Sequence, residues 1–396
     1  MRLASGISLV RTAWLLAGAT LACTALLESC ASLALRAGLV RTSFDRARFD
    51  ERVLFDSDPP PVWFASYRNE LSRAWKTRWE PYVYWVTRPF EGELIRIDER
   101  GIRRTWSPPP PKSASQPPLR VFFFGGSTAW GRGARDDFTI PSLVAKELAR
   151  RGGPPVRVVN FGQSGWVSTQ ERIALALELR RGDIPDVAVF YDGVNDVFAA
   201  YQSGVAGIPQ NEIKRQIDFE RFELGLLARV ADRSSIVRIL RRLGRRDPLS
   251  PPSTRTAAER AALARAVVDD YAGNIRIVEA LANRFDFDAL HFWQPVVWSK
   301  ARPTRVESEI RSAFSPLEPL YQAVYDEVTG RPDLDRLAAF HDVRDALDDE
   351  VGTSFFDYCH VGEEANAAIA ARITPLVARA LDERLAARVA GNPPLD

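Results

Sequence analysis

Residues 119–128 read LRVFFFGGST, an apolar run that ends in two glycines and a serine. A short, nearly all-apolar run of this kind is typical of a parallel strand that is buried on both faces of a sheet. Further strand-like runs are predicted at 156–159, 186–191, 289–297 and, shorter, 337–343. Helical spacing is predicted over 141–150, 169–179, 257–283, 307–328 (interrupted by prolines) and 363–387. Strands that alternate with helices predict an α/β fold with a doubly wound parallel sheet.

The N-terminal segment has a different character. Between residues 12 and 35 the only charged residue is Glu28, and the length suits one membrane-spanning helix. We interpret residues 1–39 as an uncleaved signal anchor, with a cleaved signal peptide and a buried soluble helix as alternatives. More arginines follow the segment than precede it, so by charge alone the body could face the cytoplasm. A short N-terminal tail more often stays inside, which favours a membrane-anchored protein whose body is extracytoplasmic (periplasmic).

Residues 40–118 form an aromatic-rich lead-in, which we expect to cap the main domain, with a substrate-binding platform as the alternative. A hairpin is predicted from 94–98 and 102–106 around Glu99-Arg100-Gly101. Residues 107–118, SPPPPKSASQPP, read as an extended linker. The main domain is expected over 119–396, with a helical insertion at 203–256 that is either a lid or a surface addition.

Composition limits the classes of protein. The chain of 396 residues is 46% hydrophobic and 26% charged, as expected for a globular protein. A net charge of +2 implies no polyanionic partner, so no nucleic-acid binding is expected. Of three cysteines only Cys359 lies outside the N-terminal segment, which excludes a disulfide framework. Three scattered histidines without an HExxH pattern argue against a zinc site, so no metal is expected.

Three polar motifs follow predicted strands, where ligands of an open α/β sheet bind. In GGST, Gly126 permits a sharp turn and Ser127 is a candidate nucleophile, although an N-capping serine is the alternative. In NFGQSGW, residues 160–166, Gly165 allows close backbone approach. In GVND, residues 193–196, the amide of Asn195 is a candidate oxyanion donor. Each motif alone is also a turn signal.

A fourth motif, DYCH at 357–360, precedes the last predicted helix. Asp357 and His360 are three residues apart, so the carboxylate can orient the imidazole as a general base. Cys359 is interpreted as a packing residue. His291 and His341 are expected to be structural, and Gln294 is a candidate pocket residue.

Together the four motifs resemble those of the SGNH hydrolase superfamily, the GDSL-type esterases and lipases. The resemblance covers about 119–387 and implies a flavodoxin-like three-layer α/β/α sandwich. It implies a Ser127–His360–Asp357 triad, an acyl-serine intermediate and no metal or organic cofactor. It also implies an oxyanion hole from the Ser127 N–H, the Gly165 N–H and the Asn195 side chain. The sequence departs from the usual GDS pattern in having Gly126 where aspartate is common.

The expected function is that of a membrane-anchored serine hydrolase that cleaves an acyl ester of a small molecule, glycan or lipid. One alternative is an O-acyltransferase that modifies envelope glycans with the same residues. The other is a catalytically silent scaffold. The sequence identifies no protein partner.

Overall fold

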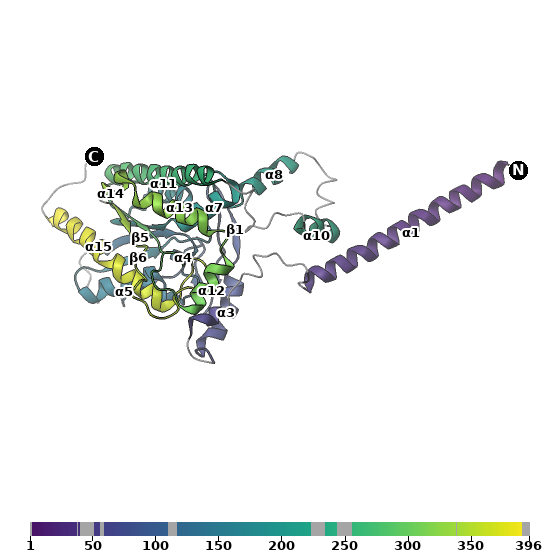
Figure 1. Cartoon of the computed structure of the whole chain (residues 1–396). Coiled ribbons are helices and arrows are strands. Elements are labelled where there is room, and N and C mark those ends of the chain that lie inside the picture. The colour runs from purple at the N-terminus through teal and green to yellow at the C-terminus, as the bar shows by residue number, and fades with distance from the viewer. Residues whose placement is uncertain are drawn as a thin grey trace. The chain divides into compact units, whose positions relative to one another are not determined.

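A computed structural model of the chain describes residues 2–37, 39, 51–55, 59–109, 117–222, 234–243, 256–337 and 339–389 (Figure 1). The chain divides into two compact units. The first comprises Met1–Arg48 and Ile213–Ser250, and the second Phe49–Glu212 and Pro251–Asp396. Most of the predicted linker, parts of the predicted insertion and the start of the lead-in lie outside the described residues.

The larger unit contains a five-stranded parallel sheet with the order β6-β5-β7-β8-β9. Its strands are β5 (Leu119–Gly125), β6 (Val156–Asn160), β7 (Val187–Asp192), β8 (Asp288–Trp293) and β9 (Phe340–Asp342). All five were predicted from their apolar runs. The predicted fourth strand extended to residue 297, but β8 ends at Trp293, and the chain turns at 297–299. The predicted parallel sheet is therefore confirmed.

Helices cover both faces of this sheet. Figure 1 shows α5 (Ile140–Arg151) and α15 (Glu363–Val389) on one side and α11 (Ala257–Phe285) on the other. On the α11 side, α6 (Ser168–Arg180) joins a core in which side chains of β5 and β7 pack against both helices. The three-layer α/β/α architecture is confirmed, and it follows from strands that are apolar on both faces.

The other described helices of the larger unit are α4 (Ser127–Trp130), α7 (Val194–Ser203), α12 (Arg305–Ala313), α13 (Glu318–Thr329) and α14 (Pro332–Asp335), with two 3₁₀ turns, η1 (Glu51–Leu54) and η2 (Asp136–Phe138). The smaller unit contains α10 (Ser235–Leu243) and all of α8 (Glu212–Phe222) but its first residue. The predicted helix at 307–328 is broken between α12 and α13. Pro319 lies in the first turn of α13, where its missing N–H costs nothing.

The lead-in contains α3 (Trp63–Ala74) and two antiparallel strand pairs. One pair is β1 (Thr77–Glu80) with β2 (Tyr84–Thr87), and the other is β3 (Phe90–Glu91) with β4 (Arg96–Ile97). The hairpin predicted from 94–98 and 102–106 is present as a short antiparallel pairing, with a bridge from Ile97 to Arg103 and backbone hydrogen bonds from Asp98 to Ile102 (3.0 Å) and from Arg104 to Arg96 (2.8 Å). Arg103 also bridges to Asn160 of β6, and its side chain enters the domain interior.

In the smaller unit, α1 (Arg2–Arg36) contains the predicted apolar segment. Residues Arg11–Arg36 are long and apolar enough to cross a membrane, a property that signal sequences near an N-terminus share. Within this unit the Glu28 carboxylate accepts hydrogen bonds from the Ser234 hydroxyl (2.8 Å) and the Ile236 N–H (3.2 Å), at the start of α10.

Candidate active site

Two glycines bring the chain from β5 into α4. Gly125 has φ 153°, and a Cβ there would lie 2.5 Å from that of Ala129. Gly126 is extended, but a Cβ on it would lie 2.0 Å from Nδ2 of Asn195. Gly126 is thus required by close approach and not by an unusual backbone angle. The turn places Ser127 as the first residue of α4, where its side chain lies at the carboxyl edge of the sheet.

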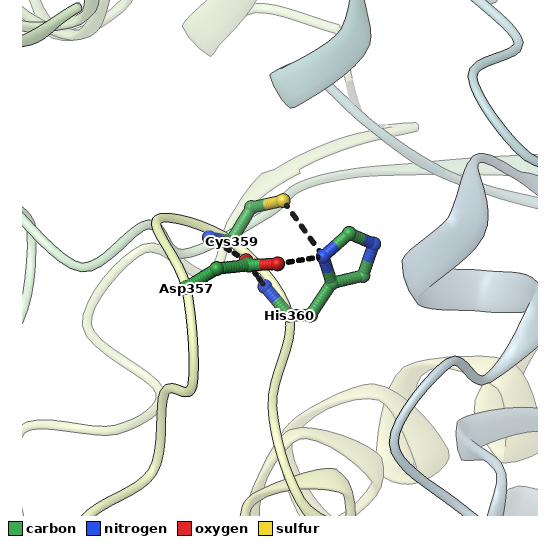
Figure 2. A group of neighbouring side chains, drawn as sticks. All are labelled: Asp357, Cys359 and His360. Carbon is green, nitrogen blue, oxygen red and sulfur yellow. Dashed lines mark hydrogen bonds and ion pairs between the residues drawn. The ribbon is translucent and has the colours of Figure 1, made fainter. Parts of the chain in front are cut away.

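Ser127, His360 and Asp357 form one chain of hydrogen bonds. Oγ of Ser127 lies 2.7 Å from Nε2 of His360, and Nδ1 of His360 lies 2.6 Å from Oδ2 of Asp357. Figure 2 shows the carboxylate pointing at the imidazole ring. Its other oxygen accepts the backbone N–H groups of His360 (2.8 Å) and Cys359 (2.9 Å). This local turn holds the carboxylate, so that the ring presents Nε2 to the serine.

The charge of Asp357 is stabilised in place. Burial alone raises its pKa, but the neighbouring His360 and the guanidinium of Arg132 outweigh this and lower the pKa below the ordinary range. Nη1 of Arg132 lies 3.8 Å from Oδ2 of Asp357. Asp357 is therefore ionised at neutral pH, which favours a proton on Nδ1 and leaves Nε2 as an acceptor.

Cys359 lies beside this pair. Its Sγ is 3.5 Å from Nδ1 of His360, and the ligand atoms of Asp357, Cys359 and His360 lie within 4.8 Å of one another. Burial and the charge of Asp357 raise the pKa of the Cys359 thiol well above its usual value. A thiol held in its protonated form is a poor nucleophile, so Ser127 is the better candidate for that role.

Asn195 is the second residue of α7, which follows β7 after Gly193. Its Nδ2 donates to the carbonyl of Trp166 (2.7 Å), and its Oδ1 accepts from Nε2 of Gln210 (3.0 Å). Gly165, the residue before Trp166, has φ 75° and lies against the Gln210 side chain. The structure therefore brings the motifs of Gly126, Gly165 and Asn195 together at one edge of the sheet.

The other residues singled out in the sequence have different surroundings. Gln294 is buried, and its Oε1 accepts from the Thr128 hydroxyl (2.7 Å), so it supports the turn that carries Ser127. His291 lies in β8, stacked on Phe190 with 4.6 Å between ring centroids. Burial lowers its pKa to about 3. His341 lies in β9, tilted against the ring of Phe292.

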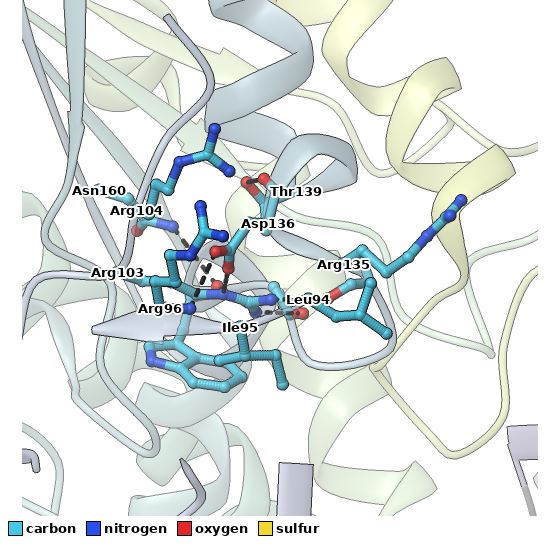
Figure 3. A network of polar contacts seen from close by, with 12 residues as sticks. Leu94, Ile95, Arg96, Arg103, Arg104, Arg135, Asp136, Thr139 and Asn160 are labelled. Carbon is cyan, nitrogen blue, oxygen red and sulfur yellow. Dashed lines mark hydrogen bonds and ion pairs between the residues drawn. The ribbon is translucent and has the colours of Figure 1, made fainter. Parts of the chain in front are cut away.

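A buried arginine of the lead-in holds the turn after α4 (Figure 3). Nε of Arg103 lies 2.9 Å from Oδ1 of Asp136. Its remaining nitrogens donate to three carbonyls, those of Trp130 (3.0 Å), Gly131 (2.8 Å) and Ala134 (2.7 Å). Nothing in the sequence distinguishes Arg103 from its many neighbouring arginines, so this role could not be predicted.

The β1–β2 hairpin holds the loop that contains Gly165. The indole N–H of Trp85 donates to the carbonyl of Ser164 (2.7 Å), and that of Trp166 donates to the carbonyl of Trp85 (2.9 Å). Oε1 of Gln163 accepts from the Thr87 N–H (2.7 Å). The lead-in thus packs on the turn after α4 and on the loop that contains Gly165.

Residues 123–309 match the family model described as the GDSL-like Lipase/Acylhydrolase family, a range that includes Ser127, Gly165 and Asn195. No curated protein matches the chain. Similar solved structures include the acetyl xylan esterase AlAXEase, with 14% identity over 65% of this chain and 100% of that chain (TM-score 0.37). A putative arylesterase from Agrobacterium tumefaciens has 17% identity over 66% of this chain and 99% of that chain (TM-score 0.34).

Axe2, an acetylxylan esterase from Geobacillus stearothermophilus, has 13% identity over 70% of this chain and 96% of that chain (TM-score 0.33). These identities and scores are low, so the family match and the sequence motifs carry the assignment. Over residues 123–309, a little under half of its length, the chain is similar to the GDSL-like Lipase/Acylhydrolase family.

Proposed function

We propose that this protein is a serine esterase whose triad is Ser127, His360 and Asp357. The observation that carries the proposal is the unbroken hydrogen-bond chain of 2.7 Å and 2.6 Å between these side chains. The three side chains are largely buried, with residue exposures of 7%, 7% and 9%, so the serine proton is transferred with little competition from water.

In the first half of the reaction, Oγ of Ser127 attacks the acyl carbonyl while Nε2 of His360 takes its proton. The tetrahedral intermediate collapses, the carbon–oxygen bond to the alcohol breaks, and His360 returns the proton to the leaving alkoxide. Water then attacks the acyl-Ser127 ester with His360 again as the base. The acid is released and the serine hydroxyl is restored.

The negative oxygen of each intermediate needs donors. We assign these to the backbone N–H of Ser127 at the start of α4, the N–H of Gly165 and Nδ2 of Asn195. Asn195 uses one of its two amide protons on the Trp166 carbonyl, which leaves the second for the oxyanion. Removal of one such donor lowers kcat by about 10²–10³ in enzymes of this kind.

The substrate that we propose is an acyl ester of a glycan or lipid at a membrane surface. The apolar α1 helix supports this, because an uncleaved anchor would hold the esterase body beside the membrane, on its periplasmic side.

Labelling of the full-length, detergent-solubilised protein with a fluorophosphonate probe tests the reaction class. We expect labelling and ester hydrolysis in the wild type, and a fall in hydrolysis of about 10⁴-fold or more in Ser127→Ala and His360→Ala. Ser308→Ala, an exposed serine on α12, serves as the matched control and keeps full activity. A folded wild-type protein that neither labels nor hydrolyses esters refutes the proposal. Comparing acyl release with and without a glycan acceptor separates hydrolysis from acyl transfer.

A further inference from the structure

The loop after α7 folds back on the start of that helix. Gly204 (φ 81°) and Gly207 (φ 74°) both have left-handed backbone angles that glycine favours. A Cβ on Gly207 would lie 2.5 Å from an oxygen of Asp270, so the loop runs close against α11. At its far end the N–H of Asn211 donates to Oε1 of Gln202 (3.2 Å). These contacts return the chain to the carboxyl edge of the sheet.

The returning loop places Gln210 on two residues of the candidate oxyanion hole. Nε2 of Gln210 donates to Oδ1 of Asn195 (3.0 Å), which is 15 positions earlier in the chain. Its Oε1 lies 3.1 Å from where a Cβ on Gly165 would be. A side chain at position 165 would therefore press on Gln210, in addition to opposing the positive φ of that residue.

The contact decides which end of the Asn195 amide faces the hole. An asparagine amide has a donor end and an acceptor end of nearly equal shape, so its orientation depends on its partners. The carbonyl of Trp166 accepts from Nδ2, and the N–H of Gln210 donates to Oδ1. Without Gln210, Oδ1 loses this donor and the amide is held from one end only.

We propose that Gln210 is a positioning residue that keeps Nδ2 of Asn195 directed at the oxyanion. This inference rests on the proposed esterase function. It also assigns a role to residues 204–211, at the start of the insertion expected over 203–256. This part of the insertion would then belong to the catalytic machinery.

The test compares Gln210→Leu with Gln322→Leu in the full-length protein, using a soluble acetyl ester. Gln322 is an exposed glutamine on α13 that donates within its own helix (to Asp326, 2.8 Å), so its variant controls for the change of residue type. We expect Gln210→Leu to lower kcat about tenfold, the effect of one lost hydrogen bond, while KM stays within about twofold. Gln210→Glu, which keeps the shape but cannot donate when ionised, is expected to lose at least as much.

A double-mutant cycle supplies the decisive measurement. In an Asn195→Ala background, Gln210→Leu should have no further effect on kcat, because the amide that it positions is absent. The inference is overturned if kcat of both Gln210 variants stays within about twofold of wild type, if only KM rises, or if the losses from Asn195 and Gln210 simply add. Inactive wild-type protein would instead refute the esterase proposal, and this inference would fall with it.

Discussion

Replacing Arg103 by methionine should destabilise the esterase body severely. The change keeps an apolar stem but removes the guanidinium, which is fully buried and contacts Asp136 and three carbonyls at the end of α4 and in the turn that follows (Figure 3). The Asp136 carboxylate, 2% exposed, would keep the N–H of Arg96 (2.9 Å) but lose its cationic partner. Removing one member of a buried ion pair costs about 3–5 kcal/mol, a large part of the about 5–15 kcal/mol by which proteins are stable.

The assay is urea unfolding followed by tryptophan fluorescence, with the slope of free energy against urea checked for constancy. The matched control is Arg104→Met. Arg104 pairs with Asp137 at 3.1 Å, but both side chains are about 40% exposed, so we expect a loss below about 1 kcal/mol.

A second variant, Arg103→Met with Asp136→Leu, should recover part of the loss, because the unpaired buried carboxylate is then gone. Burial already raises the pKa of Asp136 despite Arg103. In Arg103→Met this pKa should rise further. The loss of unfolding free energy relative to the wild type should therefore grow from pH 5 to pH 8. If Arg103→Met loses no more unfolding free energy than Arg104→Met, the buried ion pair does not stabilise the fold as expected.

Two further predictions concern the edge of the sheet. Gly126→Ala should lower ester hydrolysis by about 10²-fold with little loss of helix content by circular dichroism, because the new Cβ would lie 2.0 Å from Nδ2 of Asn195 and displace that donor; Gly273→Ala, on α11 with room for a methyl group, should leave the rate unchanged. The second concerns two buried carboxyls behind Asn195. Burial raises the pKa of Asp196 to about 7, with a contribution from Asp192, and burial raises that of Asp192 to about 6. Because these native-state values exceed the ordinary aspartate pKa, the native state holds its protons more tightly than the unfolded chain. Their contribution to stability is complete below about pH 4 and is lost as pH rises through 6 and 7, so the unfolding free energy should fall between pH 5 and pH 8. In Asp196→Asn the unfolding free energy should fall less over this pH range. A pH dependence equal to that of the wild type would contradict the raised pKa of Asp196.

The sheet could be predicted from the sequence because its signals are local. The apolar run at 119–124 and those at 156–159 and 186–191 each coincide with a strand of the parallel sheet. A parallel sheet covered by helices requires strands that are apolar on both faces, and this requirement is visible in any single strand. The lead-in was harder to predict, since its strands are only two to four residues long, too short for a clear alternating pattern.

The motifs of the candidate site were also visible, for a related reason. Glycines at 125, 126 and 165 mark turns, and Asp357 lies three residues from His360, so the sequence alone determined both the turns and this local acid–base pair. Only the tertiary structure decided that His360 meets Ser127, 233 positions away, at 2.7 Å. It also selected Arg103 and Gln210 from many similar side chains. The physical reason is that a long polar side chain has no preferred partner until the fold brings distant segments together and burial makes an unpaired group costly.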